Sequence, residues 1–117
     1  MKRILMATLI SCMTSQVSAG TLHDIATTCN WELGRSDGSV ISQSVALRED
    51  GTLSYKNENE HLWEVNDGEI VFRNINGAIS TRFSSINIDP TTNQITLLGK
   101  VLQDPSSEIK HTLTCYK

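Results

Sequence analysis

The sequence predicts an all-β domain: an eight-stranded antiparallel up-and-down barrel or strongly coiled meander, similar in general shape to lipocalins and avidin. Turn dipeptides recur along the chain, and the runs between them are rich in β-branched and aromatic residues, without a convincing ten-residue helical pattern. Cys29 and Cys115 stand at the two ends of this series. A bond between them would join the first strand to the last and remove the edges of an open sheet. A two-sheet β-sandwich is the alternative.

The turn signals divide the chain into eight segments. Asp-Gly and Asn-Gly favour tight hairpins because Gly, Asn and Asp tolerate positive φ, and Asp-Pro also favours a turn. These signals lie at 37–38, 50–51, 67–68, 76–77, 89–90 and 104–105. The predicted strands are 29–34, 40–48, 52–57, 61–66, 69–74, 78–88, 94–102 and 108–116.

Alternation within the segments predicts which side chains face inward. Cys29 and Cys115 each fall on an apolar face of their strand. In the sixth strand the apolar residues stand at odd positions up to Phe83 and at even positions from Ile86. One extra residue near 84–85 would produce this change of phase, so we expect a β-bulge there.

The N-terminal residues predict an export signal. Lys2 and Arg3 precede an apolar run, 4–10, that is too short to span a bilayer, and small residues follow at 17–19. Cleavage after Ala19 would make the protein periplasmic or secreted. The predicted organisation is a signal peptide over 1–19, an N-terminal lead-in over 20–28 and a single β domain over 29–117.

A lipoprotein signal is the alternative. Residues 9–12, Leu-Ile-Ser-Cys, resemble a lipoprotein processing site, at which a signal over 1–11 is removed and Cys12 is lipidated. The protein would then be anchored to a membrane. Either route leaves Cys29 and Cys115 as a pair in an exported chain, which predicts a disulfide.

The charge balance limits the class of partner. Without a 19-residue leader the 117-residue chain has 98 residues, enough for one domain with a modest core. Removing Lys2 and Arg3 leaves 8 of the 10 basic side chains against 13 acidic ones, a net charge of −5. An acidic surface without basic clusters argues against nucleic acid and anionic membranes as partners. A membrane is therefore expected only through a lipid on Cys12.

The lead-in carries a helix-start signal. Residues 21–24, Thr-Leu-His-Asp, resemble a capping box, with Leu22 and Ile25 on one side. They predict one helical turn that plugs an end of the barrel. A disordered lead-in is the alternative.

A specific order of residues resembles a small accessory β-module that accompanies bacterial sugar-transferring domains. The resemblance spans about residues 45–114 and includes an Asn-Glu-x-x-Trp stretch at 59–63, a Gly-x-x-x-Thr-Arg-Phe stretch at 77–83 and His-Thr-Leu at 111–113. It implies a non-catalytic role in glycan-related binding. This chain adds an export signal and the cysteine pair, so the resemblance does not carry a cytoplasmic role in sugar transfer.

Asn59, Glu60 and Trp63 are the first candidate binding residues. An amide and a carboxylate can bind sugar hydroxyls while a Trp ring supplies an apolar platform. The alternative is that Trp63 belongs to the core and that Asn59 and Glu60 organise a turn by capping backbone amides.

Arg82 and His111 are further candidates. If Arg82 points outward, it pairs with Glu64 or Glu69 on a neighbouring strand; if it closes a barrel end, it stacks on a Trp ring. His111 lies on an apolar face, where it contacts a ligand or is a buried, hydrogen-bonded side chain. No ligand spacing supports a metal site.

The sequence favours binding over catalysis. It contains no nucleophile-elbow motif, no free thiol once the cysteines pair, and no rigidly placed carboxylate pair. We therefore expect no enzyme activity and no cofactor. The leading function is recognition of a glycan or another exposed surface. The alternatives are an exported inhibitor of a lysozyme or protease and a carrier of a small apolar ligand inside the barrel.

Overall fold

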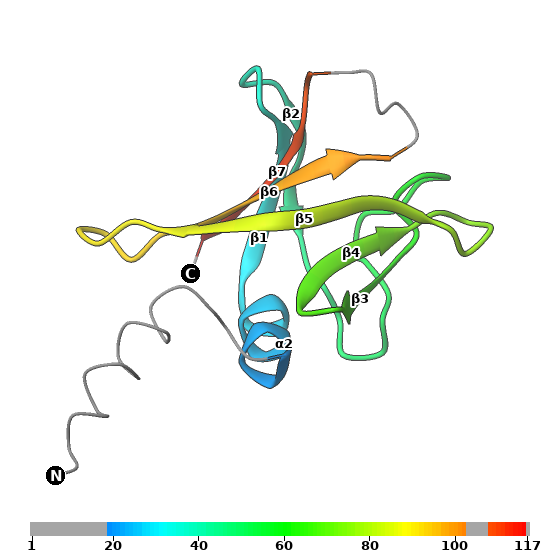
Figure 1. The fold of residues 1–117 in the computed structure, drawn as a ribbon, viewed down its shortest axis with the longest axis horizontal. Helices are drawn as coiled ribbons and strands as arrows, with labels where there is room; N and C mark the ends of the chain where they lie inside the picture. The colour runs from blue at the N-terminus through cyan, green and yellow to red at the C-terminus, as the bar shows by residue number, and fades with distance from the viewer. Residues whose placement is uncertain (1–18, 103–107, 117) are drawn as a thin grey trace, which may run out of the picture.

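The structure, a computed structural model, describes residues 19–102 and 108–116 as one helix and one antiparallel sheet of seven strands in the order β2-β1-β7-β6-β5-β4-β3 (Figure 1). The elements are α2 (Ala19–Thr28), β1 (Asn30–Arg35), β2 (Val40–Val45), β3 (Leu62–Asn66), β4 (Glu69–Arg73), β5 (Ile79–Ile88), β6 (Ile95–Val101) and β7 (His111–Tyr116). The predictions for the signal peptide and for Cys12 lie outside the described residues.

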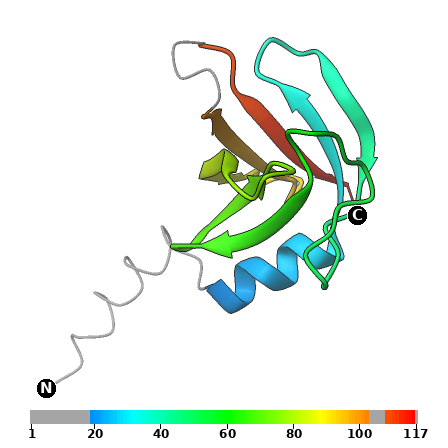
Figure 2. The same cartoon turned by 90° about the vertical axis from the view of Figure 1, so that its right-hand side faces the viewer.

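The first and last strands are neighbours, as the cysteine pair predicted. β1 and β7 pair along their whole length, from Asn30 opposite Tyr116 to Arg35 opposite His111. The sheet curls into a half-barrel whose two edge strands are β2 and β3 (Figure 2). Because the described strands form one continuous sheet, the two-sheet sandwich is wrong.

The predicted strand 52–57 is not found, and its loss explains why the eight-stranded barrel does not close. This segment makes two isolated bridges, Thr52–Leu62 to the start of β3 and Leu53–Leu47 to a residue just after the end of β2, without forming a ladder with either edge strand. The other seven predicted strands are confirmed, with shifted ends; the last begins at His111.

Polar side chains account for the missing strand. Ser54 Oγ accepts a hydrogen bond from the amide of Ala46 at 2.7 Å. Asn57 Oδ1 accepts from the amides of Asn59 and Glu60 at 2.8 and 2.7 Å. These bonds satisfy backbone donors locally, which is how Ser and Asn compete with a sheet ladder.

The predicted bulge in β5 is confirmed. The register between β5 and β6 shifts between Phe83 and Ser85. The extra residue changes which side chains face inward, as the change of phase required.

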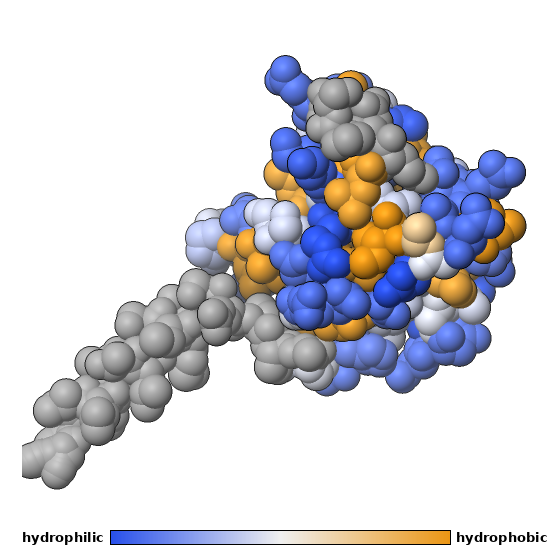
Figure 3. Space-filling view, turned by 45° about the vertical axis from the view of Figure 1, so that its right-hand side comes forward, coloured by the Kyte–Doolittle hydropathy of each residue, from blue (hydrophilic) through white to orange (hydrophobic). Residues whose placement is uncertain are grey.

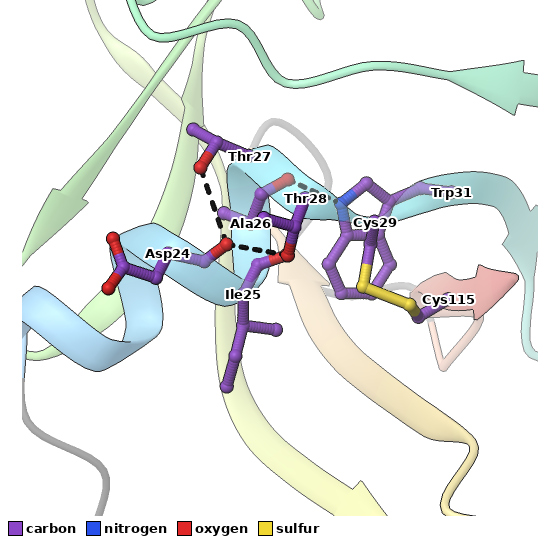
Figure 4. Close-up of a disulfide and its surroundings, with 8 residues drawn as sticks. All are labelled: Asp24, Ile25, Ala26, Thr27, Thr28, Cys29, Trp31 and Cys115. Atoms are coloured by element: carbon purple, nitrogen blue, oxygen red, sulfur yellow. Dashed lines mark hydrogen bonds between the residues drawn. A yellow bond between two sulfur atoms is a disulfide. The ribbon is translucent and has the colours of Figure 1, made fainter. Parts of the chain in front are cut away.

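The lead-in forms a helix of ten residues, longer than the single predicted turn. It contacts β3 and β4 and lies across one end of the half-barrel (Figure 2). Leu22 and Ala26 are buried. The Trp31 indole Nε1 donates to the Ala26 carbonyl at 3.0 Å, so the helix end and β1 hold each other (Figure 4). In the described residues, no helix has the length and apolar character needed to cross a membrane.

Large side chains occupy the interior of the half-barrel. Trp31, Leu33 and Phe72 have no exposed surface, and the Phe72 and Phe83 rings meet edge-to-face at 5.1 Å. Gly99 lies opposite Phe83, and a Cβ on Gly99 would come within 2.6 Å of the Phe83 ring. Gly99 therefore makes room for an aromatic ring in the core.

A disulfide joins the end of the helix to the last strand. Cys29 follows α2, Cys115 lies on β7, and their Cα atoms are 5.4 Å apart across a sequence separation of 86 (Figure 4). Both cysteines are buried.

We expect replacement of both cysteines, Cys29→Ser with Cys115→Ser, to destabilise the protein by about 4 kcal/mol, because the unfolded chain regains the entropy of a long loop. Since a domain is stable by roughly 5–15 kcal/mol, this is a large fraction of the total. Urea unfolding measures the change, and reduced wild-type protein should match the double variant. An unchanged unfolding midpoint would contradict the prediction.

We expect Gly99→Ala to destabilise the domain by about 1–3 kcal/mol, because the added methyl group overlaps the Phe83 ring. The control is the double variant Gly99→Ala with Phe83→Leu, in which a smaller side chain gives the methyl group room. Thermal unfolding should show less than additive losses in the double variant. Strictly additive losses would mean that the two residues do not compete for space.

Candidate functional site

Trp63 anchors an aromatic contact between the helix and the sheet. Its side chain is 4% exposed, and its indole Nε1 donates to the Arg48 carbonyl at 2.8 Å. The His23 ring, from α2, lies against it with ring centroids 5.3 Å apart and planes tilted by 33°. His23 is half-buried, so the pair presents a partly accessible aromatic surface.

An open groove runs beside this pair. We call it the His23–Trp63 groove, and it is lined by Gly20, His23, Glu49, Asp50, Gly51, Trp63, Glu64 and Val65. Three separate elements build it: the start of α2, the turn at 49–51 and β3. The backbone amide of Trp63 donates to the Gly51 carbonyl at 3.0 Å, which holds the turn against β3.

The groove is acidic, and two of its carboxylates are held ionised. The Thr52 hydroxyl and amide donate to Asp50 Oδ1 at 2.6 and 3.0 Å, which lowers the pKa of Asp50. The Arg73 guanidinium lies 2.7 Å from Glu64 and lowers the pKa of that carboxyl. Glu64 follows Trp63 in β3, so its carboxylate lies on the other face of the strand, where it pairs with Arg73. The exposed side chains of Glu49 and Asp50 are the ones that can accept hydrogen bonds from hydroxyl, amine or guanidinium donors in the groove.

Asn59 and Glu60 do not line this groove with Trp63. Glu60 is 4% exposed and accepts from Asn57 Nδ2 at 2.9 Å, and the Asn59 carbonyl accepts from the Ser80 hydroxyl at 2.5 Å. Asn59 thus holds the entry to β3 against β5, whereas Glu60 is bonded to Asn57 within its own loop, so the Asn-Glu-x-x-Trp stretch does not form one continuous surface.

Arg82 pairs with Glu69 on the neighbouring strand at 3.0 Å, as its outward placement predicted. Its guanidinium also donates to the Asn66 carbonyl and side chain at 3.3 and 3.1 Å. Arg82 lies between Thr81 and Phe83, which are buried, and opposite Val71, which is buried but does not belong to the hydrophobic core cluster. Because side chains alternate along a strand, Arg82 and its partners form a polar network on the face of the sheet that points away from this core.

His111 is half-buried at the opposite end of β7 from Cys115. Its Nδ1 lies 3.4 Å from the Thr81 hydroxyl. Burial lowers the pKa of His111; the Glu60 carboxylate opposes this shift and the Arg35 charge adds to it. The imidazole is therefore held neutral at physiological pH, as expected of a packed histidine.

No similar protein assigns a function to this arrangement: neither the family models nor the curated proteins and solved structures contain a match to the chain. Within 19–102 and 108–116, no three His, Cys, Asp or Glu side chains converge as metal ligands would. Sequence reasoning missed His23, Glu49 and Asp50 as binding residues, because in the sequence they are only parts of a helix start and a turn.

We expect the protein to lose stability as the pH falls from about 7.5 to 5. The pKa of His111 is lower in the folded state than in the unfolded chain, so below the unfolded pKa of about 6.5 the unfolded state binds the proton more readily. Urea unfolding at several pH values measures the loss. His111→Gln should reduce it, whereas His61→Gln serves as a matched control on a half-buried histidine. An unchanged pH profile in His111→Gln would contradict the prediction.

Proposed function

We propose that this protein is an exported, non-catalytic domain that recognises glycans through the His23–Trp63 groove. The observation that carries the proposal is the combination, in one open groove, of an aromatic pair and two exposed acidic residues, Glu49 and Asp50. Sites for polar small molecules commonly join a few placed polar groups to an aromatic surface. The buried Cys29–Cys115 disulfide is consistent with an oxidising extracellular or periplasmic environment, which supports export.

Each part of the groove has a distinct task in this proposal. Glu49 and Asp50 accept hydrogen bonds from sugar hydroxyls. The half-buried His23 ring packs against an apolar face of the sugar, and the Trp63 ring packs against the His23 ring. The resemblance to a module that accompanies sugar-transferring domains points to the same ligand class.

Inhibition of a lysozyme or protease is the second candidate, and the turn at 49–51 is the feature that favours it. Glu49 and Asp50 are exposed, and the Thr52 bonds to Asp50 hold the turn in one shape. A rigid acidic turn suits a basic active-site cleft. The carrier function has less support, because the inward side chains of the described strands pack into one core cluster.

We expect His23→Ala and Glu49→Gln each to weaken glycan binding by about tenfold or more, measured on a glycan array and by calorimetry with the best array ligand. Neither substitution removes a buried side chain, so the melting temperature should change little. Trp63→Ala is a poor probe because it removes a buried aromatic ring and should cost about 3–5 kcal/mol of stability.

Glu58→Gln is the matched control, since Glu58 is an exposed carboxylate outside the groove. If both groove variants bind the array like wild type, the groove is not the glycan site. If no glycan binds but the protein inhibits a lysozyme or protease at a near-stoichiometric dose, and Glu49→Lys abolishes that inhibition, the second candidate replaces the first.

A further inference from the structure

A second surface with ligand-binding chemistry lies at the far end of β7, where the aromatic side chain of Tyr116 is 46% exposed. Asn30 of β1 pairs with Tyr116 in the ladder. On the other side β6 pairs with β7, with Thr96 opposite Thr114, and the same register continued by two residues places Gln94 opposite Tyr116. An exposed ring is thus flanked by two amide side chains on one face of the sheet.

The β5–β6 hairpin tip forms a wall beside this ring. Thr92, Asn93 and Gln94 line an open pocket of about 260 Å³ together with Cys115 and Tyr116. The tip is the yellow loop at the left of Figure 1, close to the end of β7. The pocket is therefore built from two chain segments that the sheet brings together.

Hydrogen bonds within the tip hold it in one shape. Asp89 Oδ1 accepts from the amides of Thr91 and Thr92 at 2.8 and 3.2 Å. The Asn93 amide donates to the Asp89 carbonyl at 2.7 Å, and Asn93 takes a φ of +61°. The Gln94 backbone amide donates to the Thr92 hydroxyl at 3.2 Å. Asp89 and Thr92 thus hold the shape of the tip, and the side chains of Asn93 and Gln94 are the ones that face a ligand.

The side-chain amides of Asn93 and Gln94, near Tyr116, can form hydrogen bonds with a ligand. Within the described part of the chain, the side chains of Asn93 and Gln94 make no hydrogen bond. The Tyr116 hydroxyl lies 3.4 Å from a Glu32 carboxylate oxygen, which limits where the ring can turn. A free amide offers both donors and an acceptor, and this is what a ligand with many hydroxyl groups requires.

We propose that the surface formed by Tyr116, Gln94, Asn93 and Thr92 binds a neutral saccharide ring. The exposed aromatic face would cover the C–H face of the sugar, and the amides would bond its hydroxyls. Among the described residues, the side chains that line the pocket are uncharged, which fits a neutral ligand. The inference rests on the proposed function for its ligand class but uses a different surface.

Two surfaces of this kind would let one domain hold a polymeric glycan at two points. Figure 3 shows one face of the molecule, on which hydrophilic residues surround several groups of hydrophobic ones. Two weak contacts on one rigid domain add up to a higher apparent affinity for a chain than for a single sugar.

The test is an NMR titration of the protein with chitotriose and with maltotriose, which are neutral probes. We expect the side-chain amide resonances of Asn93 and Gln94 to shift on addition of at least one probe. Tyr116→Ala should weaken that binding by about tenfold or more, whereas Tyr116→Phe keeps the ring and should bind nearly as wild type. Tyr116 is exposed, so folding should not be affected, and the amide spectrum verifies this.

Asn76→Ala, which removes an exposed amide at the β4–β5 turn, is the matched control. If the probes shift resonances of the His23–Trp63 groove but leave Asn93 and Gln94 unchanged, the second surface is wrong and the proposed function stands. If the tip resonances shift while the groove variants have no effect on the array, the second surface stands and the groove does not. If neither region responds to the probes, the second surface is also wrong.

Discussion

The pairing of β1 with β7, locked at its end by the Cys29–Cys115 disulfide, is the constraint on which the rest of this structure depends. It joins the two most distant parts of the domain, a contact whose loop-closure entropy is unfavourable and must be offset by burial. Trp31 and Leu113 supply that burial beside the disulfide, and neither has exposed surface. With the ends joined in this way, the remaining strands curl around a single core.

Because the two ends of the chain pair with each other, the gap in the half-barrel lies between two strands that are consecutive in the chain. The two edge strands are β2 and β3, and the chain between them replaces an eighth strand by two bridges and a set of polar turns. The His23–Trp63 groove lies in this region, where the turn at 49–51 meets α2 and β3. The candidate site therefore lies beside the gap in the half-barrel, where the turn at 49–51 leads into the segment that does not form a strand.

The candidate site shows why residues close in sequence are poor guides to a shared surface. Asn59, Glu60 and Trp63 were grouped because they are adjacent, but Glu60 is buried near His111 whereas Trp63 packs against His23. His23 and Glu49 line the same groove, although neither belongs to a sequence motif that indicates binding. Their proximity is created by the packing of α2 against β3, a contact that no local pattern encodes.

Alternation, turn dipeptides and the cysteine pair predict the β class, seven of the strands, the bulge in β5 and the pairing of the first and last strands, because these signals act locally or covalently. The failure of the segment 52–57 to form a strand emerges in the folded chain alone, where Asn57 and Ser54 accept hydrogen bonds from backbone amides that a ladder would have used. The tertiary structure likewise decided the length of α2, which buries Leu22 and Ala26 against the sheet. Burial and cross-strand proximity depend on the whole fold, and so do the surfaces available for binding.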